Sequence, residues 1–122
     1  MYTIRTENVA GIVAAGYALE ESVSDMRATA EKLATFVKTT IDGIRANVPS
    51  IYVNGDTGNR LPGIVNIAFD NISGESLMHL LDLKAICVST SSACTSGKDG
   101  PSHVLMALGL SAKQAESAIR IS

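Results

Sequence analysis

The chain has 122 residues, of which 46% are hydrophobic and only 4% aromatic, and its formal net charge at pH 7 is −2. This length predicts a single domain, residues 1–122, that buries roughly two-thirds of the surface of the unfolded chain. The ten Lys and Arg are scattered, which argues against a nucleic-acid footprint or a polybasic membrane surface. No apolar run approaches the roughly 20 residues of a membrane span, and we expect no signal peptide. Because two cysteines are too few for a disulfide framework, we expect a cytoplasmic, reducing compartment.

Two helical patterns open the chain. Apolar residues and glycines share one helical face from Glu7 onward. Residues 22–25 offer N-cap chemistry, which predicts a bend or a restart of the helix. Beyond them, apolar residues recur every three or four positions from Met26 to Val48, as in an amphipathic helix that packs on a core, and Pro49 ends this pattern.

Four segments have the composition of strands. Ile51–Val53 and Ile64–Phe69 flank a turn-rich segment, Ala85–Ser89 includes a short apolar run, and Arg120 begins a fourth strand near the end of the chain. Because Cys87 belongs to an apolar run, we expect it to lie in the core.

Capping signals place the remaining helices. Ser73 precedes a leucine-rich helix, Gly100-Pro101 opens another that Gly109 closes, and the segment 111–114 forms a capping box before a last helix. The elements together predict an α+β fold: a small, mostly antiparallel sheet of three or four strands, with helices packed on one face.

A metal site is not expected. His79, Cys87, Cys94 and His103 are separated by eight, seven and nine residues, which matches no zinc-binding pattern. His79 is expected to be a partly buried helix residue, and His103 a solvated residue at the start of its helix.

Cys94 stands out by its surroundings. Small, hydroxylated residues flank it on both sides, and it lies just past a predicted strand and before a predicted helix. Residues of this kind build no core, so we expect an exposed thiol on a polar loop, where scaffolds often present working residues. From composition alone, a surface cysteine without a role remains the alternative.

The residues around Cys94 also carry a resemblance. The sequence S-S-A-C-T-S-G at 91–97, followed by P-S-H-V-L-M-A-L-G-L at 101–110, resembles the active-site loop of the pyridoxal-phosphate-dependent cysteine desulfurases. It is most similar to the long-loop group that feeds sulfur to iron–sulfur cluster assembly. Segments 6–13, 61–69 and 118–122 resemble further parts of that family, so nearly the whole chain is covered. The resemblance implies the C-terminal small domain of fold-type I pyridoxal-phosphate enzymes.

The resemblance implies roles for three residues. Cys94 matches the nucleophile that takes the sulfur of L-cysteine, which forms an enzyme persulfide and releases L-alanine. Arg120 matches the arginine that holds the substrate carboxylate, and Thr6 matches a threonine that reaches the cofactor phosphate of the neighbouring subunit. A guanidinium suits the carboxylate because it pairs with it through two hydrogen bonds.

The chain also departs from the family pattern. Ser91 stands where the family often has Gly, and Thr3-Ile4-Arg5 replaces the family's Arg-x-Gly. The large domain that holds pyridoxal phosphate has no counterpart, because no lysine of this chain (Lys32, Lys38, Lys84, Lys98 or Lys113) sits in the family's Schiff-base motif. We therefore expect a fragment whose parent enzyme binds the cofactor, whereas the isolated chain does not and is inactive.

The expected function is that of a cysteine desulfurase fragment, with L-cysteine as the parent's substrate. A sulfur acceptor or an iron–sulfur scaffold protein is the expected partner. Two alternatives remain open: a free-standing sulfur-carrier or scaffold-binding module that uses Cys94 without a cofactor, and a fragment of a selenocysteine lyase. The apolar residues Val9, Ile12 and Val13 at the start of the first helix also predict a homodimer or other self-association.

Overall fold

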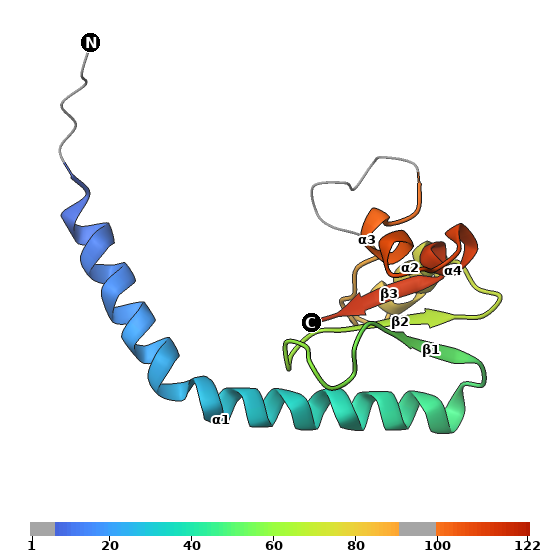
Figure 1. The fold of residues 1–122 in the computed structure, drawn as a ribbon, viewed down its shortest axis with the longest axis horizontal. Helices are drawn as coiled ribbons and strands as arrows, with labels where there is room; N and C mark the ends of the chain where they lie inside the picture. Colours follow the sequence, from blue (N-terminus) through green and yellow to red (C-terminus); the bar gives the residue numbers. More distant parts are fainter. Residues whose placement is uncertain (1–6, 91–99) are drawn as a thin grey trace, which may run out of the picture.

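The computed structural model describes residues 7–90 and 100–122, so Thr6 and Cys94 lie outside the described residues. Among the described residues, no helix is both long and apolar enough to cross a membrane. In chain order (Figure 1), the elements are α1 (Val9–Asn47), β1 (Ile51–Asn54), β2 (Val65–Phe69), α2 (Gly74–Asp82), α3 (His103–Ala107), α4 (Ala112–Glu116) and β3 (Ala118–Ile121).

The three strands form an antiparallel sheet in the order β1-β2-β3. The register places Tyr52 of β1 opposite Ala68 of β2, and Ile67 of β2 opposite Ile119 of β3. The predicted α+β fold with a small antiparallel sheet is thus confirmed.

Helices cover both faces of this sheet. On one face Val65 and Ile67 of β2 pack with Val37 and Ile41 of α1. On the other face a second cluster joins strand residues to α3 and α4 through Ala68, Leu105, Ala115 and Ala118. Figure 1 shows α1 on one side of the strands and α2, α3 and α4 on the other. The prediction that helices pack on one face is therefore wrong, because β2 carries apolar residues on both faces and both need cover.

The first helix is continuous over 39 residues, and the Asn8 side chain caps it by accepting a hydrogen bond from the Gly11 N–H at 3.0 Å. Figure 1 shows a bend between its blue N-terminal part and its cyan C-terminal part. Near this bend, the Ser22 hydroxyl donates to the Ala18 carbonyl at 2.7 Å and the Ser24 hydroxyl donates to the Glu21 carbonyl at 2.8 Å. Such side-chain bonds to the preceding turn often bend helices. The bend predicted at residues 22–25 is confirmed, without a restart.

Three of the predicted helix caps are present, but Pro101 does not open a helix, because α3 begins at His103 after Ser102. The Ser73 hydroxyl accepts from the Ser76 N–H before α2. Ser111 and Gln114 form the full capping box of α4. Gly109 follows α3 with a φ of 90°, a left-handed conformation that favours glycine after a helix.

The segment after α2 ends that helix instead of forming a strand. Ala85 has a φ of 58°, its N–H donates to the Asp82 carbonyl at 2.8 Å, and the Ile86 N–H donates to the Leu81 carbonyl at 3.0 Å. This pattern is a Schellman motif, which satisfies the last carbonyls of a helix. The predicted strand Ala85–Ser89 is therefore wrong, and only its last residue forms a bridge to the sheet.

Cys87 lies between this helix end and the bridge, and it is exposed. The prediction that Cys87 lies in the core is wrong, because the backbone here follows a helix terminus and does not run through the sheet.

Ala85 provides a test of the helix end. A non-glycine residue in the left-handed region costs roughly 1–2 kcal/mol, so Ala85→Gly is expected to raise the free energy of unfolding by about 1 kcal/mol. Ala34→Gly, at an exposed position inside α1, is the control and is expected to lower it by about 0.5–1 kcal/mol. Urea denaturation measures both. A loss of stability in both variants would contradict the left-handed conformation of Ala85.

Candidate functional site

A row of polar residues crosses the sheet. Asn54 of β1 is opposite Asn66 of β2, and Asn66 is opposite Arg120 of β3. Directly opposite residues point to the same face of a sheet, and for these three it is the face that carries Ala68, two residues after Asn66. The Asn54 side-chain N–H donates to the Asn66 side-chain oxygen at 2.7 Å, so the two amides hold each other in place.

Ser89 extends this row beyond β3. The Ser89 N–H donates to the Arg120 carbonyl at 3.0 Å, and the Arg120 N–H donates to the Ser89 carbonyl at 2.6 Å. Such a reciprocal pair is the closely spaced hydrogen-bonded pair of an antiparallel ladder. It fixes the chain shortly before residues 91–99 to the strand that carries Arg120.

A large hollow of about 1340 Å³ lies over this face. Thr90 and Gly100, the described residues on either side of segment 91–99, both line it. Other lining residues come from the polar row and from the start of α3, namely Asn54, Asn66, Ser89, Ser102, His103 and Arg120. The described chain thus leads into and out of the cysteine segment at one hollow.

Arg120 is the predicted site residue that the structure describes. It is partly buried, after the buried residues Ala118 and Ile119. No ion pair joins Arg120 to a carboxylate among residues 7–90 and 100–122. A guanidinium in this setting suits an incoming carboxylate, which it can hold with two parallel hydrogen bonds.

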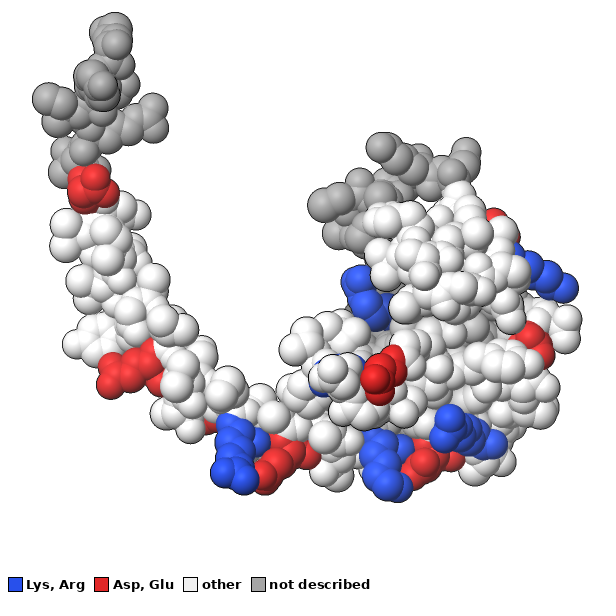
Figure 2. Space-filling model, in the orientation of Figure 1, with Lys and Arg blue, Asp and Glu red and all other residues white. Residues whose placement is uncertain are grey.

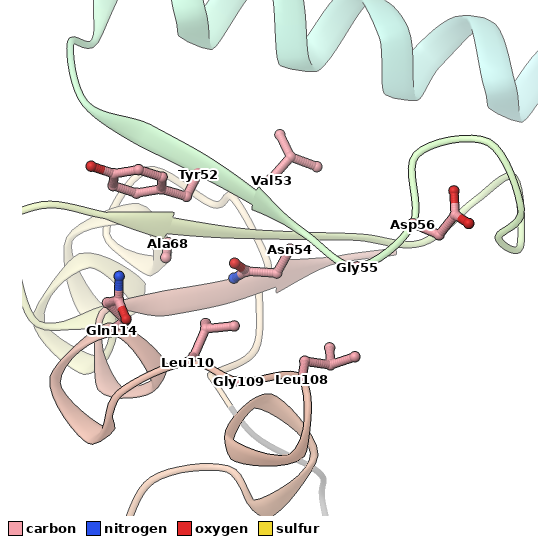
Figure 3. A pocket seen from close by; sticks show the side chains of 10 residues that line it. All are labelled: Tyr52, Val53, Asn54, Gly55, Asp56, Ala68, Leu108, Gly109, Leu110 and Gln114. Atoms are coloured by element: carbon pink, nitrogen blue, oxygen red, sulfur yellow. The ribbon is translucent and has the colours of Figure 1, made fainter.

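A smaller cavity of about 520 Å³ lies beside β1 (Figure 3). Leu108 and Leu110 supply apolar walls, and Asp56 stands apart on the loop that follows β1. The polar groups here are engaged locally. The Gly58 and Asn59 N–H groups donate to the Asp56 carboxylate and hold its pKa below the usual value.

Gln114, which also lines the smaller cavity, is engaged as well, because its side-chain oxygen accepts from the Ser111 N–H at 3.0 Å. Asn54 is committed to its bond with Asn66. A binding site needs polar groups that are free to orient a ligand. Asn54 and Gln114 line both cavities, but Arg120 lines only the larger hollow, which is therefore the better candidate.

The described residues do not form a metal site. No group of three or more His, Cys, Asp or Glu residues in the described part of the chain could hold a metal ion. His103 is exposed, as expected, and so is His79, which corrects its prediction as partly buried. A Schiff-base lysine works best when it is desolvated, yet every described lysine is exposed: Lys32, Lys38, Lys84 and Lys113. The described residues therefore do not supply the desolvated lysine that pyridoxal phosphate needs.

The family described as "Aminotransferase class-V" matches residues 1–122, the whole length of the chain. The chain belongs to this family. The family match and the cysteine desulfurases among the curated relatives confirm the resemblance of the sequence to that group.

The chain is also similar to curated cysteine desulfurases. The chain is 43% identical over 119 residues to the cysteine desulfurase IscS of Clostridium botulinum, and 39% identical over 117 residues to the cysteine desulfurase NifS of Azotobacter vinelandii. Each match covers 96% of this chain but only 30% and 29% of the relative. The chain thus spans less than a third of the length of these relatives.

Solved structures agree with the fold. A NifS-like protein superposes with a TM-score of 0.79 at 29% identity, over 98% of this chain and 29% of the other. A NifS-like protein from Rickettsia africae gives a TM-score of 0.77 at 25% identity, over 98% of this chain and 30% of the other. The sheet and its helices are therefore the fold of one part of these larger proteins.

Sequence reasoning missed Gly74, which supports the arginine strand. Gly74 is buried at the start of α2, and a Cβ atom there would lie 2.7 Å from the Ala118 carbonyl oxygen and 2.9 Å from that of Glu116. Both contacts are with backbone, which yields less easily than a flexible side chain. Its position directly after the helix cap Ser73 was the available signal, since a glycine inside a helix needs a reason.

Replacing Gly74 tests this close approach. Gly74→Ala is expected to lower the free energy of unfolding by about 1–3 kcal/mol through overpacking against β3. Gly43→Ala is the matched control, because Gly43 also lies in a helix but has open space where its Cβ would be. The control is expected to gain about 0.5–1 kcal/mol. Equal gains for both variants in urea denaturation would show that α2 does not depend on a glycine here.

Proposed function

We propose that this chain is part of a cysteine desulfurase and carries its sulfur-accepting thiol, Cys94. The observation that supports this most directly is the position of Arg120, in the same hollow that Thr90 and Gly100 line on either side of the cysteine segment. Arg120 would anchor the substrate carboxylate. It lines the same hollow as Thr90 and Gly100, the residues on either side of the segment that contains Cys94. Cys87, although exposed, does not line that hollow.

The proposed reaction conserves all atoms. The C–S bond of L-cysteine breaks, its sulfur forms a new S–S bond with the Cys94 thiolate, and the carbon gains a proton to give L-alanine. The sulfur is oxidised to the persulfide level as the carbon is reduced, so no external oxidant is needed. Persulfide sulfur would then pass to an acceptor thiol, for iron–sulfur cluster assembly or other sulfur delivery.

Arg120 would hold the carboxylate of L-cysteine at one end of this hollow. Its backbone is fixed between β2 and Ser89, so the side chain extends from a rigid position on the sheet. Holding the carboxylate leaves the sulfur end of the substrate directed to the nucleophile, which is the positioning role that raises reaction rates.

Pyridoxal phosphate, bound by the parent enzyme, would supply the electron sink for C–S cleavage. Its binding groups would come from the remaining length that the curated relatives have. We assign Thr6 to the cofactor phosphate of a neighbouring subunit on the basis of the family resemblance. A sulfur acceptor or scaffold protein would be one partner, and a second copy of this chain is another that we expect.

The isolated chain is expected to carry sulfur but not to release it from cysteine. With L-cysteine and free pyridoxal phosphate, alanine and sulfide formation is expected to stay at the rate of the cofactor alone. With a low-molecular-weight persulfide, the chain is expected to become persulfidated at Cys94, as located by mass spectrometry of peptides. Cys87→Ser retains this modification and Cys94→Ser loses it. Persulfidation of Cys87 alone, or turnover by the isolated chain, would contradict the assignment.

Arg120 is tested in a full-length enzyme made by exchanging this chain for the matching segment of the A. vinelandii relative. Arg120→Ala is expected to lower kcat/KM for cysteine by about 30- to 150-fold, because losing a charged hydrogen-bonded contact costs about 2–3 kcal/mol. The absorbance of the bound cofactor is expected to stay unchanged. Lys113→Ala, which removes another cation from the lining of the hollow, is the matched control and is expected to stay within about twofold of the parent. Equal kinetics for Arg120→Ala and the parent would remove Arg120 from the site.

A further inference from the structure

The backbone brings the side chains of Asn66 and Arg120 close together. Arg120 exchanges both of its backbone hydrogen bonds with Ser89, at 3.0 and 2.6 Å, so its N–H and C=O point away from β2. Its pairing with Asn66 of β2 is therefore the non-hydrogen-bonded type of an antiparallel ladder, in which the Cα atoms are only about 4.5 Å apart and the side chains lie closer. The Asn66 amide and the Arg120 side chain thus leave the sheet side by side.

The Asn66 amide has a fixed orientation. Asn54, on the other side of Asn66, donates its side-chain N–H to the Asn66 side-chain oxygen at 2.7 Å. In a planar amide the oxygen and the nitrogen diverge from the same carbon, so an oxygen held toward β1 leaves the nitrogen directed to the side of Arg120 and the hollow. Among residues 7–90 and 100–122, this nitrogen has no hydrogen-bond acceptor.

Two kinds of donor therefore lie next to each other in the lining of the hollow, the guanidinium of Arg120 and the amide N–H groups of Asn66. A carboxylate has about four lone-pair sites, so it can accept the two bonds of an arginine fork and a further bond from an amide. Figure 2 shows the Lys and Arg side chains of this face in separate patches without a large basic area. One fixed cation beside a neutral donor suits a single carboxylate better than a polyphosphate chain.

The acidic residues that line the hollow lie near the other end of the strands, namely Asp70, Glu75 and Glu116. Asp70 directly follows β2, so it lies four residues, or up to about 13 Å, beyond Asn66 along the chain. Glu116 ends α4, four residues before Arg120. The polar row is therefore separated from these carboxylates, which would otherwise compete with a ligand for the guanidinium.

We propose that Asn66 is a second binding residue for the substrate carboxylate and donates its side-chain N–H to the group that Arg120 holds. Asn54 is a positioning residue that fixes the Asn66 amide and does not touch the carboxylate. A second donor from a different strand prevents the carboxylate from turning on the Arg120 fork, which orients the rest of the substrate. The inference rests on the proposed function, since it takes the α-carboxylate of L-cysteine or L-alanine as the ligand.

Binding of the product L-alanine tests Asn66 without relying on sulfur transfer. In the full-length enzyme that carries this chain in place of the A. vinelandii segment, L-alanine is titrated and the absorbance of the bound cofactor is followed. Asn66→Ala is expected to raise the Kd of L-alanine by about 10- to 100-fold, because a hydrogen bond to a charged group is lost. The KM for L-cysteine is expected to rise by a similar factor, with kcat nearly unchanged.

The control for this substitution is Asn59→Ala. Asn59 is exposed and does not line the hollow, so the Kd of L-alanine is expected to stay within about twofold of the parent.

Two further variants separate the donor from its shape and from its orientation. Asn66→Asp keeps the size and the acceptor for Asn54 but replaces the N–H donors with a second oxygen. It is expected to weaken L-alanine binding at least as much as Asn66→Ala, because the new carboxylate pairs with Arg120 and repels the ligand. Asn54→Ala is expected to weaken binding by about two- to fivefold, and to have no effect when Asn66 is already alanine, since it acts through Asn66.

The results distinguish this inference from the proposed function. Unchanged L-alanine binding in Asn66→Ala and Asn66→Asp, together with weak binding in Arg120→Ala, would overturn the role of Asn66 and leave Arg120 in place. That result is expected if the rest of the parent enzyme supplies the acceptor for the amide. Equal effects of Asn54→Ala in both backgrounds would overturn the positioning role of Asn54. An enzyme that binds L-alanine through Asn66 but forms no persulfide at Cys94 would contradict the proposed function instead.

Discussion

The central strand β2 carries apolar residues on both faces, and this is the constraint on which the structure depends. Val65 and Ile67 of β2 point to one side and Ala68 to the other, and all three are buried. A three-stranded sheet of such short strands is not stable alone and needs helices to cover its apolar surface. The second half of α1 covers one side, and α3 and α4 cover the other. The positions of these three helices follow from this demand.

The same strand positions the candidate site. Asn66 lies between Val65 and Ile67, so it faces the side that α3 and α4 cover, and the register sets it between Asn54 and Arg120. Polar groups are therefore held in a row by the backbone ladder, which is more rigid than a loop. This rigid row fits the proposed site, since working residues on loops are often positioned by such a scaffold.

The apolar side chains in the two halves of α1 lie in different environments. Its second half completes the core, and its first half extends apolar side chains into solvent. The hydrogen bonds from the Ser22 and Ser24 hydroxyls to carbonyls of the preceding turn lie near the boundary between the halves.

The sequence by itself determined most elements, because caps, breakers and apolar periodicity act over a few residues: Ser73, Pro49 and the capping box at Ser111 each acted locally as expected. It also contained the family motif around Cys94. Tertiary structure decided what depends on distant partners. At Ala85 two local signals competed, because the residue could continue a strand or end a helix. The hydrogen bonds to Leu81 and Asp82 formed the helix end, which left Cys87 exposed. The cover of both sheet faces, the close approach at Gly74 and the shared hollow of Arg120 depend on strand register and helix packing, which no local pattern encodes.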